Sequence, residues 1–337
     1  MLAPMTNKQS HEDGVASNAE IDWLARCAQG GFGMVQTCGA SVRADGKTFE
    51  GQLGVYSDRH LDGLTRMASA IKNAGALCSI QLHHGGPRSS AALGGVAVGP
   101  SDDPRSGVRG LSTAEVEQLR DAFIEAAKRT EQAGFNGVEV HSAFGFIPAL
   151  FLSPIHNRRT DRYGGSLEGR SRLLFEIIDG IRQRCGDEFQ IGLRISIERY
   201  GFKLDEMRDV AAEAFRAGAL DYLDLALWDA AKEVSGGGPS KGRSILSLFT
   251  QLPRFGVRLG VAGKLMGAQG AAWAINEGCD FVLIGRQAIV HHDFPNRVLK
   301  DQNYHSPSLP VSAEHLRREG LSPTFLSYMS TWPDFVK

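Results

Sequence analysis

The chain has 337 residues, of which 42% are hydrophobic and 22% are charged, and its formal net charge at pH 7 is −1. A length of this order is normal for a decorated α/β barrel, and the near-zero charge gives no electrostatic reason to expect nucleic acid or an anionic membrane as a partner. The five cysteines are widely spaced and form no C-x-x-C pair, which argues against a disulfide framework, a zinc site or an iron–sulfur cluster.

The first ten residues, MLAPMTNKQS, contain no charged segment followed by a long apolar run, so we expect no signal peptide. No apolar run of the sequence approaches the ~20 residues that cross a bilayer. Together with the cysteine spacing, these features predict a protein of a reducing, cytoplasmic compartment that has no membrane partner.

Short, almost continuously hydrophobic runs alternate along the chain with longer amphipathic segments. Runs of this kind are typical of strands that are buried on both faces of a parallel sheet. In chain order, the predicted strands are residues 1–3, 32–37, 77–82, 137–141, 190–196, 221–227, 257–263 and 280–285.

The clearest helix is predicted for residues 111–134, between the third and fourth of these runs. Ser112 and Glu115 have the spacing of a capping box, in which each side chain accepts a hydrogen bond from the other residue's backbone. Gly134 is a residue at which the helix can end. A hydrophobic stripe at helical spacing lies between them: Val116, Leu119, Phe123, Ala127 and Thr130.

Eight strand–helix units predict a (β/α)8 TIM barrel, and we expect residues 1–337 to form a single domain. A doubly wound sheet is disfavoured because no G-x-G-x-x-G follows a strand. The first strand is apparently truncated: either it is very short, or the natural chain starts upstream of Met1. A truncated strand would leave ladder groups unpaired and barrel core exposed. Segments 85–110 and 235–243 are predicted to be long loops over one barrel face.

The C-terminal ends of barrel strands are where catalytic side chains sit. Two of the predicted ends carry a glycine followed by a cationic residue, Gly263–Lys264 and Gly285–Arg286. Backbone N–H groups and a cation at such turns bind phosphate, whereas glycine alone also serves to make a tight turn. Spacing leaves both interpretations open.

Gln81 and Arg194 also lie at predicted strand ends. A carboxamide both donates and accepts hydrogen bonds, which suits the edge of a heterocycle. An arginine stabilises negative charge on a cofactor. The alternative for each residue is that it satisfies a buried loop carbonyl.

Two pairs of adjacent histidines, His83–His84 and His291–His292, are candidates for metal ligands by residue type. Neighbouring residues on a strand face opposite ways, so we do not expect either pair to bind one ion. The sequence therefore predicts no metal site.

Eight segments of the chain form a recognisable series. The most specific is FLSPIHNRRTDRYGGSLEGRSR (151–172), and the others are APMT (3–6), GVYSD (54–58), QLHHGG (81–86), AGFNGVEVH (133–141), GLRIS (192–196), VAGK (261–264) and DFVLIGR (280–286). Taken in chain order, these segments resemble those of the Old Yellow Enzyme family of NAD(P)H:flavin oxidoreductases. The resemblance covers nearly the whole chain.

The resemblance implies a barrel that holds FMN non-covalently at its C-terminal mouth, with NADH or NADPH as the reductant. It also implies a small-molecule substrate and a homo-oligomer. Thr6 would lie near the redox-active edge of the flavin, Gln81 would hydrogen-bond the pyrimidine ring, and Arg194 would lie at its N1/O2 edge. The implied FMN-binding residues are Pro4, Met5, Thr6, Gly39, Gln81 and Arg194, with Gly263, Lys264, Gly285 and Arg286 at the phosphate.

The family's usual reaction moves a hydride from NAD(P)H, through the flavin, to the β-carbon of an activated alkene such as an enone. Two donors in a His-x-x-His or His-x-x-Asn pattern hold the substrate carbonyl, and a tyrosine two residues later is the acid. Here the first donor remains as His141, but the other two positions are Phe144 and Phe146. Losing one such donor costs about 10²–10³ in rate, and losing a general acid about 10²–10⁴.

This departure leaves three functions open. The first is an ene-reductase whose proton comes from a neighbouring loop, with Lys8, His84, Tyr200 and Asp229 as candidates. In the second, the two phenylalanines form an apolar wall for a specialised substrate that undergoes redox-neutral isomerisation or oxidation. The third is a flavin-binding barrel that has no catalytic activity.

The last residues, 319–337, are rich in aromatic side chains for a terminus. Aromatic side chains gain much free energy from burial. We expect this tail to dock on its own barrel or on a neighbouring chain.

Overall fold

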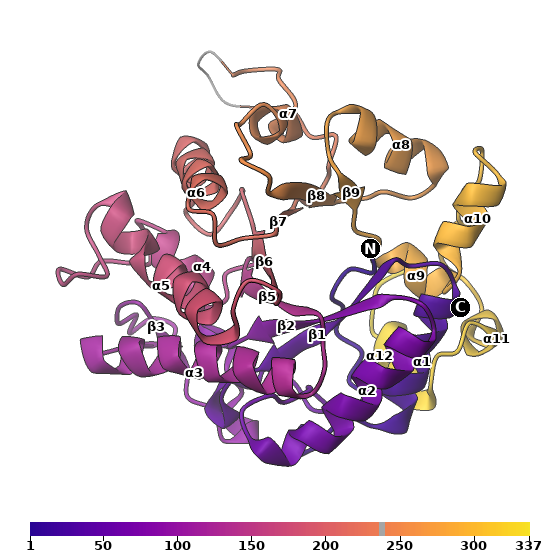
Figure 1. Cartoon of the computed structure of the whole chain (residues 1–337), viewed down its shortest axis with the longest axis horizontal. Coiled ribbons are helices and arrows are strands. Elements are labelled where there is room, and N and C mark those ends of the chain that lie inside the picture. Colours follow the sequence, from indigo (N-terminus) through magenta and orange to yellow (C-terminus); the bar gives the residue numbers. More distant parts are fainter. Residues whose placement is uncertain (236–239) are drawn as a thin grey trace.

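The core of the molecule is a parallel sheet that curls into a barrel. The computed structural model describes residues 1–235 and 240–337, so residues 236–239 of the predicted loop 235–243 lie outside the described residues. The sheet has the order β1-β2-β5-β6-β7-β8-β9, and Figure 1 shows helices surrounding it. Its strands are β1 (Met34–Ser41), β2 (Leu77–His83), β5 (Gly137–Ser142), β6 (Gln190–Ile195), β7 (Tyr222–Ala226), β8 (Arg258–Ala262) and β9 (Phe281–Val282).

The first residues of the chain close the barrel between β1 and β9. Leu2 forms parallel bridges to Val35 on one side and to Ile284 on the other. The Leu2 N–H donates to the Met34 carbonyl at 2.9 Å, and the Ile284 N–H donates to the Met1 carbonyl at 3.0 Å. The predicted first strand is therefore one bridged residue long, and the prediction of a (β/α)8 barrel with a truncated first strand is confirmed.

Helices follow most strands and cover the outside of the barrel (Figure 1). They are α1 (Asn18–Gln29), α2 (Leu61–Asn73), α3 (Thr113–Gln132), α4 (Ile147–Leu152), α5 (Leu167–Cys185), α6 (Leu204–Arg216), α7 (Ile245–Thr250), α8 (Ala268–Asn276), α9 (Arg286–Val290), α10 (Phe294–Lys300), α11 (Ala313–Arg318) and α12 (Pro323–Ser330). The predicted loop 85–110 contains the short pair β3 (Val98–Gly99) and β4 (Arg109–Gly110). Among the described residues, no helix is long and apolar enough to cross a membrane.

The helix predicted for residues 111–134 is α3, which is two residues shorter at each end. Its capping box is present, because the Glu115 N–H donates to the Ser112 hydroxyl at 3.2 Å and the Ser112 N–H donates to the Glu115 carboxylate at 2.8 Å. Gly134 has a φ of 84°, the left-handed conformation that ends a helix. The predicted hydrophobic stripe is buried.

The aromatic tail packs against its own barrel. The Phe325 ring of α12 meets the Trp23 ring of α1 edge to face, with 5.1 Å between the centroids, and both side chains are buried. The Val311 N–H also donates to the Phe335 carbonyl at 3.1 Å. The tail therefore docks on its own barrel, as one of the two predicted alternatives has it.

The fold predicts that Leu2 is a large contributor to stability, since its fully buried side chain closes the barrel. Leu2→Ala should lower the free energy of unfolding by about 2–5 kcal/mol, as measured by urea denaturation of the FMN-loaded protein. Leu299→Ala is the matched control, because Leu299 on α10 is 81% exposed, and its effect should stay within about 0.5 kcal/mol. Equal effects of the two substitutions would contradict the closure of the barrel by Leu2.

Candidate active site

Two adjoining cavities open at the C-terminal ends of the strands, where a barrel carries its chemistry. The smaller, of about 240 Å³, is lined by residues from the C-terminal halves of β1, β2, β5 and β6. The larger, of about 480 Å³, reaches the turns after β8 and β9. A ligand can span both cavities, because they share the lining residues Pro4, Met5, Phe144, Arg194 and Trp332.

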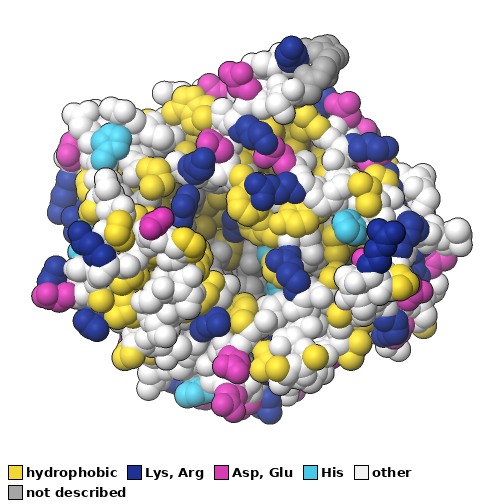
Figure 2. Space-filling model, turned by 180° about the vertical axis from the view of Figure 1, so that it is seen from behind, with side chains coloured by type: hydrophobic (Ala, Val, Ile, Leu, Met, Phe, Trp, Pro, Cys, Tyr) yellow, Lys and Arg dark blue, Asp and Glu magenta, His cyan; other side chains and the backbone are white. Residues whose placement is uncertain are grey.

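All ten residues predicted to bind FMN line these cavities. Pro4, Met5, Thr6, Gly39, Gln81 and Arg194 line the smaller one, and Gly263, Lys264, Gly285 and Arg286 line the larger one. A carboxamide and a guanidinium at one end, with two cationic side chains at the other, form a donor set that fits a planar heterocycle carrying a phosphate. Figure 2 shows the molecule hollowed at its centre, with hydrophobic side chains in the hollow and Lys and Arg side chains around it. Cations around a hollow favour an anionic ligand.

Buried polar side chains hold the lining residues Gln81 and Arg194 in place. The Nε2 atom of Gln81 donates to the Glu139 carboxylate at 2.8 Å, and Gln36 donates to the same carboxylate at 2.8 Å. Arg194 forms an ion pair with Asp224 at 3.1 Å. All five side chains are buried. Because Nε2 of Gln81 is engaged, its carbonyl oxygen is left to face a ligand.

Burial raises the pKa of both carboxyl groups of this cluster. Burial raises the pKa of Asp224 to about 8, although the Arg194 guanidinium opposes the shift. Burial also raises the pKa of Glu139, again against the effect of Arg194. Sequence reasoning missed Gln36, Glu139 and Asp224 because they lie inside runs that read as hydrophobic strands. The available signal was an acidic residue inside each hydrophobic run, Glu139 in GVEVH and Asp224 in DYLDLAL.

Two histidines face the smaller cavity from neighbouring strands. His83 ends β2 and His141 lies in β5, with 5.4 Å between their ring centroids. Burial, followed by the charges of His84 and Arg88, lowers the pKa of His83 to about 3. Burial also lowers the pKa of His141 well below its usual value, followed by the charges of His83 and Arg194. Both imidazoles are therefore neutral at pH 7.

Phe144 and Phe146 form one wall of the smaller cavity. The backbone of Phe144 is left-handed, with a φ of 54°, and its ring centroid lies 5.5 Å from the Arg194 guanidinium. The Phe146 ring lies between the Arg88 guanidinium, 3.7 Å away, and the His83 ring, whose centroid is 4.3 Å away. Neither side chain has an ionisable group, so this wall provides no hydrogen-bond donor and no acid.

The C-terminal tail contributes two aromatic residues to the site, Tyr328 and Trp332. Tyr328 is the only phenol among the described residues that line the two cavities. The Lys8 amino group lies 5.2 Å above its ring centroid. Sequence reasoning treated the tail as a docking segment and missed its role in the site, although its aromatic composition was the available signal.

The residues predicted as alternative proton sources lie outside the described lining of both cavities: Lys8, His84, Tyr200 and Asp229. The Nδ1 atom of His84 accepts from the Gly86 N–H at 3.1 Å. Tyr200 lies so close to Gly145 that a Cβ there would approach its ring to 2.6 Å. A hydrogen bond from Lys264, at 3.0 Å, lowers the pKa of Asp229, which is therefore ionised at neutral pH.

The prediction that His291 and His292 face opposite ways is wrong. They follow α9 instead of lying on a strand, and their Nδ1 atoms approach the Glu319 carboxylate at 3.3 and 2.6 Å. His315 contacts the Val290 carbonyl at 2.7 Å. A ring nitrogen of His315, a ring nitrogen of His291 and a carboxylate oxygen of Glu319 all lie within 4.8 Å of one another. These contacts link α9 to α11.

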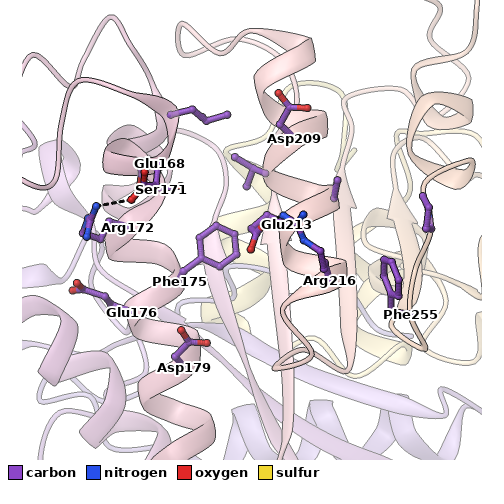
Figure 3. Close-up of a pocket in the computed structure, with 14 residues that line it drawn as sticks. Glu168, Ser171, Arg172, Phe175, Glu176, Asp179, Asp209, Glu213, Arg216 and Phe255 are labelled. Carbon is purple, nitrogen blue, oxygen red and sulfur yellow. Dashed lines mark hydrogen bonds and ion pairs between the residues drawn. The ribbon is translucent and has the colours of Figure 1, made fainter.

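A larger cavity, of about 850 Å³, lies between α5 and α6 on the outside of the barrel. Figure 3 shows Phe175 on α5 pointing into this groove, with Phe255 on the far side of α6. Arg172 and Glu168 form an ion pair at its rim, at 2.8 Å. The groove is far from the strand ends in this architecture, so size alone does not mark the site.

The whole barrel sequence matches a known family. Residues 1–305 match the sequence model of the NADH:flavin oxidoreductase / NADH oxidase family. The chain belongs to this family, and it is of the Old Yellow Enzyme type. It is an FMN-dependent oxidoreductase that uses NADH or NADPH as the reductant, as its relatives also indicate.

Two relatives in Bacillus subtilis (strain 168) cover most of the chain. The probable NADH-dependent flavin oxidoreductase YqiG is 36% identical over 312 residues, which are 89% of this chain and 82% of the relative. An NADPH dehydrogenase is 29% identical over 334 residues, which are 93% of each chain. Neither family membership nor these names specify the oxidising substrate.

Two solved structures share the fold. A complex of 2-naphthoyl-CoA reductase with 2-naphthoyl-CoA has a TM-score of 0.79 at 29% identity and covers 88% of this chain and 49% of its own. Morphinone reductase in complex with tetrahydroNAD has a TM-score of 0.77 at 25% identity and covers 91% of this chain and 88% of its own. Both are reductases by name, which agrees with a family of NAD(P)H-dependent flavoproteins.

The proposed phosphate end of the site predicts a selective loss of FMN affinity. Lys264→Gln should raise the Kd for FMN about tenfold, because it removes a charged hydrogen-bond donor, and should leave the Kd for riboflavin unchanged. Fluorescence titration of the apoprotein with each flavin measures both constants. An equal loss for the two flavins would contradict a phosphate role for Lys264.

Proposed function

We propose that the protein reduces the carbon–carbon double bond of an activated alkene, such as an enone. FMN, when bound, supplies the hydride, and NAD(P)H reduces it again. The single observation that carries the proposal is the placement of His141, a buried neutral donor, in the same cavity as Gln81 and Arg194. A donor in that position polarises a carbonyl next to the residues that hold the cofactor.

The chain's own residues divide the work. Arg194, held by Asp224, keeps a positive charge against the cofactor and favours electron transfer to it. Thr6 and Gln81 line the same cavity and hold the heterocycle, with the Gln81 carboxamide oriented by Glu139. The His141 N–H donates to the substrate oxygen, where negative charge develops as the hydride arrives at the β-carbon.

The proton for the α-carbon does not come from the Phe144–Phe146 wall. Tyr328 is the internal candidate, because it is the only phenol among the described residues lining the cavities, and water is the external one. A Tyr328→Phe variant separates the two sources: rapid-reaction kinetics should show slower alkene reduction, with unchanged reduction by NAD(P)H, only if Tyr328 is the donor.

A second function is favoured by the same wall. With no acid at Phe144 or Phe146, a hydride can be added to a substrate and taken back after a bond rotation, which gives isomerisation without net redox change. Product formation without NAD(P)H consumption identifies this reaction.

We also propose that residues 1–337 act as one FMN-binding domain within a homo-oligomer. Light scattering of the holoprotein measures the oligomeric state.

The proposed reaction predicts that alkenes reoxidise the reduced protein. Anaerobic mixing of the NADH- or NADPH-reduced protein with cyclohexenone, maleimide and larger enones should restore the oxidised flavin spectrum with at least one of them. If none restores it while the flavin is readily reduced, the proposal is wrong.

The composition of the wall predicts the effect of restoring an acid. Phe146→Tyr should accelerate cyclohexenone reduction by about 10²-fold or more if protonation limits the rate. Stopped-flow absorbance measures this step, and the rate of flavin reduction by NAD(P)H is the internal control. An unchanged oxidative rate would show that proton transfer is not limiting.

A further inference from the structure

The ends of β2 and β5 place two histidines side by side. The two strands are parallel neighbours, and their register pairs Leu82 with Val140, so that the following residues, His83 and His141, adjoin each other at the mouth. Their ring planes are tilted by 33°, and both rings line the smaller cavity. His83 is 3% exposed and His141 is 5% exposed.

The polar atoms of these two rings lack the partners that another buried histidine has. The ring nitrogens of His60 contact the carbonyl oxygens of Ser57 and Asp13 at 2.9 and 3.1 Å. Both nitrogens of His83 and the Nδ1 atom of His141 are buried without a hydrogen-bond partner among the described residues. A buried polar group without a partner costs about 1–3 kcal/mol, so the two rings indicate a ligand that accepts one hydrogen bond from the N–H of each neutral imidazole.

Packing alone does not account for His83. Its closest aromatic neighbour is Phe146, which meets it edge to face at 4.3 Å, and an N–H contact to a ring is weaker than a hydrogen bond. Gly39 leaves the other side of the ring open, since a Cβ there would lie 3.2 Å from the His83 side chain. His83 therefore lies at the cavity between Gly39, which has no side chain, and the ring of Phe146.

We propose that His83 and His141 together donate hydrogen bonds to the carbonyl oxygen of the substrate, so that His83 replaces the donor that Phe144 does not supply. This inference rests on the proposed function and deepens it by assigning a second residue, His83, to the substrate oxygen. When the hydride bonds to the β-carbon, the π electrons move to the carbonyl oxygen. The two N–H groups stabilise that charge until a proton reaches the α-carbon and the carbonyl re-forms.

Neutral imidazoles can fill this role, because each carries one N–H that can donate to the substrate oxygen. The groups that face the pair are cationic or neutral: Arg88 and His84 near His83, and Arg194 near His141. Their charges and burial lower the pKa of both histidines. Protonation of either ring occurs only well below pH 6.5, so ketone binding that depends on the pair does not change across neutral pH.

The test is binding of cyclohexanone, a saturated ketone that the enzyme cannot reduce, to the oxidised FMN-loaded protein. The flavin absorbance change reports its Kd. His83→Phe should raise that Kd about tenfold, as expected for the loss of one hydrogen bond, whereas His83→Asn, which keeps an N–H donor, should raise it less than threefold. Cyclohexene, which has no acceptor, is the matched ligand control and should bind His83→Phe as it binds the unmodified protein.

Each outcome decides the inference. Unchanged cyclohexanone binding in His83→Phe overturns it. Equal losses for cyclohexanone and cyclohexene, or equal losses in His83→Phe and His83→Asn, assign His83 to packing and also overturn it. Thermal melting and FMN content identify a misfolded variant, in which case His83→Leu, which is also apolar and is smaller, replaces His83→Phe in the same comparison. If His83 governs ketone binding but no alkene reoxidises the reduced protein, the donor pair stands and the proposed reduction fails.

Discussion

A buried guanidinium between two carboxyl groups is the interaction on which the site depends. Arg194 forms an ion pair with Asp224 at 3.1 Å, and its charge also acts on Glu139. An isolated buried charge costs several kcal/mol, so the arginine is held in the barrel only because this cluster compensates it. The same cluster orients Gln81 through Glu139. One layer of buried polar side chains thus holds both Arg194 and Gln81 in place, the two residues that are proposed to contact the heterocycle of the cofactor.

Next to this charged layer the chain places an almost uncharged one. His83 and His141 are neutral, and the wall beside them is made of Phe144 and Phe146. A low dielectric strengthens any hydrogen bond made to a developing charge. The contrast suits the tasks proposed for the two halves of the site: the charged half is proposed to hold the cofactor, and the neutral half is proposed to hold a carbonyl. Tyr328 of the tail closes the neutral half from the side of the C-terminus.

Much of the fold could be predicted, because its signals are local. The strand runs, the capping box of Ser112 and Glu115, and the left-handed Gly134 all depend on neighbouring residues, and each is present. The cofactor positions could be predicted from segments that resemble a family. The prediction that His291 and His292 face opposite ways was wrong because it used the alternation of side chains along a strand. Both residues instead follow a helix, and both rings reach Glu319.

By itself the sequence determined the alternation of strands and helices and the barrel, since both rest on residue patterns within short segments, and its family resemblance indicated the residues that are proposed to hold FMN. It also determined that Phe144 and Phe146 carry neither a donor nor an acid. Only the tertiary structure decided that His83 adjoins His141 and that Tyr328 lines the same cavity. The reason is physical: the register between neighbouring strands and the docking of a distant tail arise from packing across the whole barrel, which no local pattern encodes.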